Sequence, residues 1–156
     1  MDDNMNMKSI PTYILAGLIT LATVACKDTQ SKVETAGDTT FAKKTFEALA
    51  QGDSKVAEYI DWPVFTSMGE NVGVHYSAQA TPEEKQNFVQ GYITQFATSF
   101  RENGGSVDTV TNWRVLSHDS NNTQVVADAA GGTLNIIVSE RNGEEKVSSI
   151  TMGSVR

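Results

Sequence analysis

Cys26 is the only cysteine of the 156-residue chain, and a lone thiol that follows an export-like segment requires an explanation. It directly follows an apolar run over residues 10–25, IPTYILAGLITLATVA, which Lys8 precedes. This run is shorter than the roughly 20 apolar residues that cross a bilayer, and it ends in small residues, which favours an export signal. A lone cysteine cannot form an internal disulfide, whereas acylation of its sulfur would anchor the chain to a membrane. The alternative is an ordinary secretory signal followed by an unmodified thiol.

Histidines and carboxylates are the residues that could transfer protons. His75 and His118 are the only two histidines, and histidine titrates near neutral pH. A carboxylate such as Asp61 or Asp128 could serve instead, as could the pair of His118 with Asp119. The sequence that begins at His118, HDSNN, has the composition of an exposed turn, and no spacing places these groups on one wall. We therefore expect no catalytic residue, with an enzyme as the alternative.

Metal, nucleotide and nucleic-acid sites are not indicated. Two histidines and one cysteine supply too few ligands for a convincing zinc site. The glycines form neither the G-x-G-x-x-G pattern nor a P-loop, and G-x-S-x-G is absent. A net charge of -7 disfavours binding to a phosphate backbone, which requires lysine and arginine. We expect no metal, no cofactor and no nucleic-acid partner.

Several aromatic side chains could line a binding pocket. An apolar pocket with a few polar tips would suit a small hydrophobic or lipid-like ligand. The alternative is that these rings fill the core of a small domain, which is the commoner role of aromatics at helical spacing. The predicted pocket residues are Trp62, Phe65, Tyr92, Phe96 and Trp113.

The residues that lead to the cysteine, Leu21-Ala22-Thr23-Val24-Ala25-Cys26, resemble the lipobox of bacterial lipoproteins. The resemblance implies cleavage after Ala25 and a diacylglyceryl group on Cys26. Residues 1–25 would then be a lipoprotein signal peptide, and Cys26 would hold the mature protein on a membrane.

The residue after the cysteine carries a sorting signal by the same resemblance. Lys27, rather than Asp, implies a lipid-anchored protein of the bacterial cell envelope, on the outer membrane and facing the periplasm. Residues 26–37 are polar and lack any period, so we expect the acylated cysteine to be followed by a flexible tether. The folded domain is predicted over residues 38–156.

Two helices are predicted at the start of this domain. Apolar residues recur at the spacing of one helical face between Asp38 and Gly52, and the glycine can end the helix. A shorter helix is expected from Ser54 through Ile60, until Trp62-Pro63 disfavours its continuation.

The third helix has the clearest start. Thr81 and Glu84 form a capping box around a proline at the first helical position. The pattern predicts a helix over Pro82–Arg101 with a wide apolar stripe. The preceding segment, Trp62–Ala80, has no sustained period and is expected to be a partly ordered loop, in which Val72–Tyr76 could form a short strand.

The last third of the chain, Val107–Met152, is predicted to form four strands. Apolar and polar residues alternate, and the dipeptides Gly131-Gly132 and Asn142-Gly143 are typical of tight hairpin turns. Such a sheet needs a layer on its apolar face, and Pro82–Arg101 carries the largest apolar stripe. The predicted fold class is therefore α+β, a curved antiparallel meander packed on helices.

This order of elements resembles the nuclear transport factor 2-like superfamily, a cystatin-like cone that includes SnoaL-type proteins. Thr40–Asp53 is similar to the opening helix and its Gly-Asp corner, and the strands around Asn142-Gly143 are similar to the closing pair. The resemblance covers Asp38–Met152. It implies a cone but no single activity, because this fold hosts isomerases, dehydratases, carriers and interaction modules.

The predicted function is binding of an apolar small molecule or of a partner protein at the envelope by a non-enzymatic domain. Two alternatives stay open. Thr81–Arg101 faintly resembles the helix of toluene-tolerance-type periplasmic phospholipid carriers, and isomerase-like members of the fold use a pocket carboxylate. Related folds often dimerise, so an open side of the sheet could also join two copies.

Overall fold

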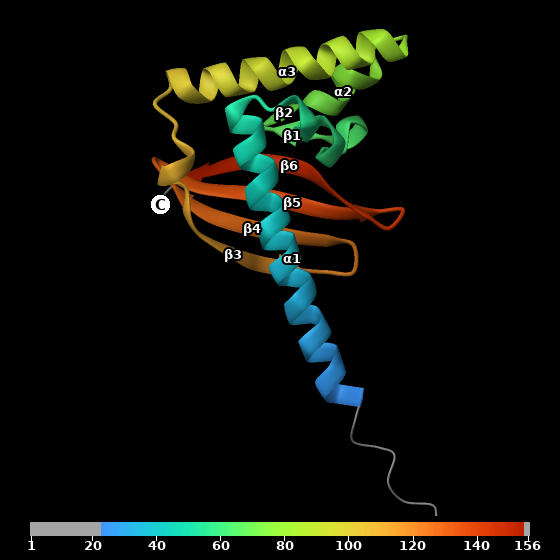
Figure 1. Cartoon of the computed structure of the whole chain (residues 1–156), viewed down its shortest axis with the longest axis vertical. Coiled ribbons are helices and arrows are strands. Elements are labelled where there is room, and N and C mark those ends of the chain that lie inside the picture. Colours follow the sequence, from blue (N-terminus) through green and yellow to red (C-terminus); the bar gives the residue numbers. More distant parts are fainter. Residues whose placement is uncertain (1–22, 155–156) are drawn as a thin grey trace, which may run out of the picture.

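The computed structural model describes the backbone of residues 23–154 and the side chains of residues 36–153. It has an α+β fold in which helices pack on a single curved, unclosed sheet of six strands, so the α+β part of the predicted fold class is confirmed (Figure 1). The elements in chain order are α1 (Thr23–Gln51), the 3-10 helices η1 (Ser54–Tyr59) and η2 (Trp62–Val64), β1 (Thr66–Ser67), β2 (Glu70–Asn71), α2 (Val72–Ser77), α3 (Pro82–Glu102), η3 (Val107–Thr109), β3 (Thr111–His118), β4 (Asn122–Ala129), β5 (Gly132–Arg141) and β6 (Glu144–Ser154).

The four long strands form the predicted antiparallel meander. The strand order is β2-β1-β6-β5-β4-β3, and the short β1 pairs parallel with β6, which makes the whole sheet mixed. Asn142 and Gly143 both have positive φ, as the hairpin prediction requires. The other turn is Ala130-Gly131 rather than Gly131-Gly132, because Gly132 already pairs with Ala129 and Ser154 inside the sheet. β3 is an edge strand whose pairing with β4 has two irregularities, one of them at Asn112 with a φ of 54°.

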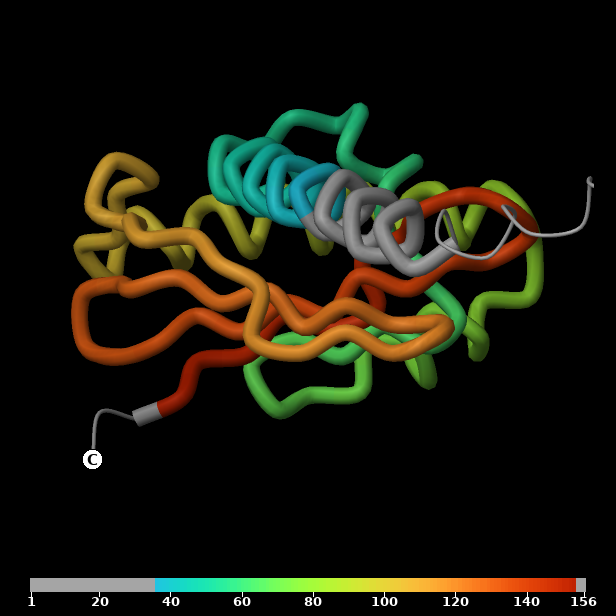
Figure 2. Tube along the Cα trace, turned by 90° about the horizontal axis from the view of Figure 1, so that it is seen from below, coloured from blue at the N-terminus to red at the C-terminus, as the bar shows by residue number. Residues whose placement is uncertain are grey.

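The helix that covers the sheet is α1, not the predicted Pro82–Arg101 helix. α1 lies across one face of the strands and contacts all of β3, β4, β5 and β6 (Figure 2). Its predicted apolar face is fully buried, with Phe46 and Leu49 at its centre. The stripe of α3 instead faces α1 and the 62–76 segment, because that segment supplies the aromatic rings that complete a second apolar layer.

α1 also begins earlier than the domain start expected from the sequence. It runs from Thr23, so the stretch 27–37, predicted to be a flexible tether, is helical. This stretch contains no proline, and Gly37 is its only glycine, so little in it opposes helix formation. Asp38, expected near the helix start, lies inside α1 and is buried. The start of the predicted signal peptide, residues 1–22, and the side chain of Cys26 lie outside what the structure describes.

The segment 62–80 is more ordered than predicted. Val72–Ser77 forms the helix α2 rather than a strand, and the Asn71 side chain caps it by accepting a hydrogen bond from the Val74 amide. Gly73 makes this turn fit, since a Cβ there would lie 2.5 Å from the carbonyl oxygen of Pro63. Glycine is thus required at this position, where α2 packs on η2.

The start of α3 is as predicted. The Thr81 hydroxyl accepts a hydrogen bond from the Glu84 amide, while the Glu84 carboxylate accepts from the amides of Ala80 and Thr81. These bonds to the charged form lower the pKa of Glu84. At the other end of α3 the predicted strand residues Val107–Thr109 form the turn η3, and the edge strand begins only at Thr111.

Candidate functional site

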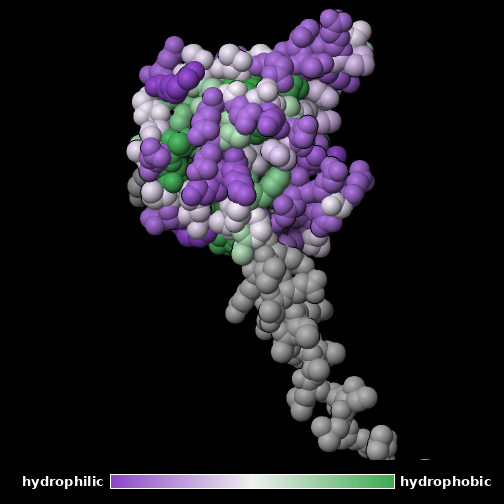
Figure 3. Space-filling view, in the orientation of Figure 1, coloured by the Kyte–Doolittle hydropathy of each residue, from purple (hydrophilic) through white to green (hydrophobic). Residues whose placement is uncertain are grey.

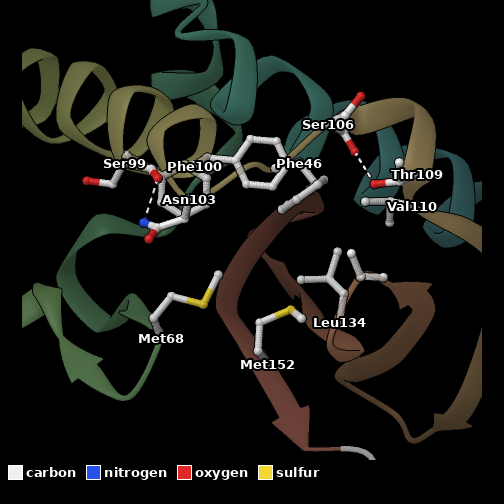
Figure 4. A pocket seen from close by; sticks show the side chains of 14 residues that line it. Phe46, Met68, Ser99, Phe100, Asn103, Ser106, Thr109, Val110, Leu134 and Met152 are labelled. Carbon is white, nitrogen blue, oxygen red and sulfur yellow. Dashed lines mark hydrogen bonds between the residues drawn. The ribbon is translucent and has the colours of Figure 1, made fainter.

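An apolar pocket of about 310 Å³ opens between the carboxyl end of α3 and the sheet (Figure 4). Apolar residues reach the surface on this side of the molecule, below that end of the helix (Figure 3). The walls come from α1, α3, η3, β4, β5 and β6, from the segment between α3 and η3, and from the turns between β1 and β2 and between β4 and β5. The lining residues are Phe46, Met68, Phe96, Ser99, Phe100, Asn103, Gly105, Ser106, Thr109, Val110, Ala129, Ala130, Leu134 and Met152.

Three phenyl rings form the inner wall of the pocket. Phe96 and Phe100 lie one turn apart on α3, so their rings stack with centroids 6.5 Å apart. The Phe46 ring, from α1, meets the edge of Phe100 at 5.6 Å. Gly105 lets the chain pass close to this wall, because a Cβ there would lie 2.5 Å from the Phe100 ring. The three rings therefore pack against one another as one continuous aromatic wall.

Two methionines form the opposite lip. Met68 and Met152 are 48% and 42% exposed, and Figure 4 shows both side chains directed toward the space in front of Phe46 and Phe100. Met68 has a φ of 51° in the β1–β2 turn, a conformation that disfavours a residue with a long side chain. Its amide donates to the Ile150 carbonyl at 2.8 Å, which fixes the turn on β6. Flexible thioethers are suited to contact with apolar ligands of varied shape.

The polar atoms at this site are uncharged. The Asn103 amide donates through Nδ2 to the Ser99 carbonyl at 2.8 Å, and the Thr109 hydroxyl donates to the Ser106 carbonyl at 2.7 Å (Figure 4). No lining residue is an acid, a lysine, an arginine or a histidine. The site can hold an apolar body with a neutral polar tip, and it offers no acid, base or nucleophile with an activated pKa.

Of the five predicted pocket residues, the structure brings only Phe96 to this pocket. Trp62, Phe65 and Tyr92 form a neighbouring cluster of edge-to-face rings, with centroids 5.6–5.9 Å apart, and the Tyr92 ring joins this cluster to Phe96 at 6.3 Å. Phe65 is completely buried there, and burial raises the pKa of the Tyr92 phenol. Trp113 packs against the side of Phe46 with centroids 6.1 Å apart.

The other lining residues were not predicted from the sequence, because they carry no pattern that is typical of a binding site. Met68, Ala129 and Ala130 lie in or beside turns. Leu134 and Met152 belong to strands, where an apolar side chain is expected whether or not a pocket is present. One signal was available, since the i, i+4 spacing from Phe96 to Phe100 extends the aromatic stripe to the end of the helix.

The candidate proton-transfer residues lie apart from the pocket. His75 is exposed, and its Nε2 lies 3.4 Å from Glu70 Oε1. Asp61 is buried, and its Oδ2 forms an ion pair with Arg141, whose Nε lies 2.6 Å away. Asp128 is half-buried and accepts hydrogen bonds from Asn112 and Arg114, which lower its pKa. The structure does not gather these groups into one site.

A polar cluster that the sequence did not suggest joins α1 to the sheet. The buried Thr123 hydroxyl donates to Asp38 Oδ2, so it accepts from His118 Nδ1, which lies 2.7 Å away. Burial, the hydrogen bond to Asp38 and the charges of Asp38 and Glu140 raise the pKa of Glu145 to about 7. The Thr123 hydroxyl is too buried to meet a substrate, so this cluster ties α1 to β4 and β6 rather than forming an active site.

The turn beside this cluster is as exposed as predicted. Asp119 accepts hydrogen bonds from the amides of Asn121 and Asn122, which lower its pKa and fix the β3–β4 turn. His118 itself is exposed.

The part of the chain that the structure describes holds neither a cluster of metal ligands nor a membrane-spanning helix. No group of three or more histidines, cysteines, aspartates and glutamates within them is arranged to hold a metal ion. No helix in that part of the chain combines the length and apolar character needed to cross a bilayer.

Comparison with known proteins adds no relative to this description. No protein-family model matches the chain, and no curated protein or solved structure is significantly similar to it.

Proposed function

We propose that this protein is a non-enzymatic binding protein of the bacterial cell envelope that holds an apolar small molecule in the pocket below the end of α3. The observation that carries the proposal is the lining itself, with three phenyl rings opposite two half-exposed methionines and no charged side chain. Apolar walls with a few neutral polar groups are the usual composition of small-molecule sites. Side chains suited to acid–base chemistry lie elsewhere, which favours binding over catalysis.

The proposal includes a lipid anchor on Cys26 and a place at the outer membrane, facing the periplasm. The lipobox-like residues before Cys26 support it, and so does the continuous helix α1, which leads from this region into the core. From Cys26 to Ala42, the first core residue of α1, a helix spans about 24 Å. Acylation would therefore place the domain on a helical stalk above the bilayer.

The proposal also includes a distant relation to the nuclear transport factor 2-like superfamily. A helix laid across a curved antiparallel meander, with the space between them lined by apolar residues, supports this relation. The pocket lies at the small end of the ~300–1,000 Å³ range of ligand sites. Its size favours a small ligand over a phospholipid with two acyl chains.

A blocking variant tests the proposal. The chain from Lys27 onward lacks Cys26 but keeps the whole described core, since every buried residue lies between Asp38 and Ile150. We expect this protein to bind a neutral fluorescent apolar probe, and we expect Met152→Trp to abolish binding by filling the mouth. Leu116→Trp is the matched control, because Leu116 is an exposed strand residue outside the pocket. Equal probe binding by wild type and Met152→Trp would refute the proposal.

A further inference from the structure

The lining of the pocket carries no charge that could pair with an ionic ligand. Arg101, Glu102 and Asp108 are next to lining residues in the chain but do not line the pocket. Arg101 is turned back on its own helix, where its Nε donates to the Ala97 carbonyl at 3.2 Å. A charged group taken from water into this space would find no counter-charge, which is unfavourable.

The backbone adds a field that opposes anions. Ser99, Phe100 and Asn103 of the lining belong to the last turn of α3 and its cap, where the partial charge of a helix is negative. The Ser99 carbonyl accepts hydrogen bonds from both the amide and the side chain of Asn103. The net charge of -7 also repels anions as they approach. A carboxylate is thus repelled by the end of α3 inside the pocket and by the net charge of the protein at longer range. An ammonium group finds no carboxylate in the lining to pair with.

The volume limits the size of the ligand. At the ~30 Å³ that one water occupies in the liquid, about 310 Å³ corresponds to roughly ten non-hydrogen atoms. The three rings and two thioethers can surround such a body on opposite sides.

We infer that this pocket selects uncharged apolar molecules of roughly ten non-hydrogen atoms, such as medium-chain alcohols, and rejects the carboxylate and the ammonium ion of the same chain. The inference rests on the proposed function and names the ligand class of the same site. It separates a binder of neutral compounds from a carrier of fatty acids.

Isothermal titration calorimetry of the chain from Lys27 with 1-octanol, octanoate and octylammonium near neutral pH tests the inference. The three probes share one chain and differ in head-group charge. We expect octanol to bind about tenfold or more tightly than either ion, since only the ions must leave a charge unpaired. Met152→Lys places a cation at the lip and is expected to raise the affinity for octanoate about tenfold relative to octanol. Leu116→Lys changes the net charge equally at a site outside the pocket and should leave the ratio unchanged.

The outcomes separate the two levels of the argument. If octanoate or octylammonium binds as tightly as octanol, and Met152→Trp abolishes that binding, the pocket is a binding site but the selection for neutral ligands is wrong. If Leu116→Lys changes the ratio as much as Met152→Lys does, the discrimination arises from the overall charge and the inference about the lining is also overturned. If no probe binds and the fluorescent probe fails as well, the proposed function itself is refuted.

Discussion

Glu145 gives the most specific prediction, because its protonation at the junction between α1 and the sheet makes the free energy of unfolding depend on pH. Its carboxyl group shares a hydrogen bond with Asp38 of α1 and lies directly across from Glu140 of β5. Like charges in directly opposite positions of a sheet repel each other. Burial comes first among the causes that raise its pKa from 4.5 to about 7. The protonated form of Glu145, as a donor to Asp38, is therefore the form that the fold favours.

The sign of the effect follows from proton binding. Between pH 4.5 and about 7 the folded protein keeps a proton on Glu145 that the unfolded chain has released. The stabilisation is complete below pH 4.5 and is lost as the pH rises through about 7. The difference between the two pKa values corresponds to at most about 3.5 kcal/mol, at ~1.4 kcal/mol per pKa unit. Because Glu145 is exposed to solvent, screening weakens these interactions, and we expect a contribution to the free energy of unfolding of about 1 kcal/mol.

The variant Glu145→Gln tests this reasoning, since the amide can still donate to Asp38 but cannot ionise. Urea unfolding followed by tryptophan fluorescence should show equal stability of variant and wild type near pH 4.5, and an advantage of about 1 kcal/mol for the variant near pH 8. Glu144→Gln is the matched control, because Glu144 is exposed and pairs with Lys146 on the surface. A difference between Glu145→Gln and wild type that stays constant from pH 4.5 to pH 8, or that favours wild type near pH 8, would refute the argument.

Three further predictions concern the backbone, the lip and the anchor. Gly132→Ala should destabilise the protein by about 1–3 kcal/mol in urea unfolding, because the new Cβ would lie 2.1 Å from the Gly153 carbonyl oxygen. The control Gly37→Ala should be neutral or stabilising, because Gly37 lies inside α1 with open space around it. Met68→Asn should raise the free energy of unfolding by up to ~1 kcal/mol, because asparagine adopts the positive φ of this position more readily than methionine. The same change should weaken binding of the neutral probe, and unchanged affinity would show that Met68 is not part of the lip. Cys26→Ser should abolish incorporation of labelled fatty acid in cells, and continued labelling would contradict the anchor.

The sequence revealed most of the elements but not which helix covers the sheet. Alternation and the Asn142-Gly143 turn located the meander, and the Thr81–Glu84 capping box located α3, because these signals are local. The cover was misassigned because the α1 stripe mixes small and large residues and looks narrower than the aromatic stripe of α3. Which stripe meets the sheet depends on partners distant in the chain.

The candidate site was harder to predict than the fold. Phe96 was identified because it belongs to a helical period, whereas the rest of the pocket meets only in three dimensions. Met68 carries no periodic signal, and its position depends on the pairing of β1 with β6, residues about 80 positions away. The cluster of Asp38, Thr123 and Glu145 was missed for the same reason, since its members come from three different elements.

The irregular course of the edge strand β3 limits the pairing of this strand with another chain. A straight outer strand would offer its free amides and carbonyls to a neighbouring chain as a template for continued pairing. Here the left-handed Asn112 and the second register shift, between Val115 and Ser117, leave only a very short regular stretch around Arg114 and Val115. A second chain that met this edge could therefore pair with only a few consecutive residues of β3.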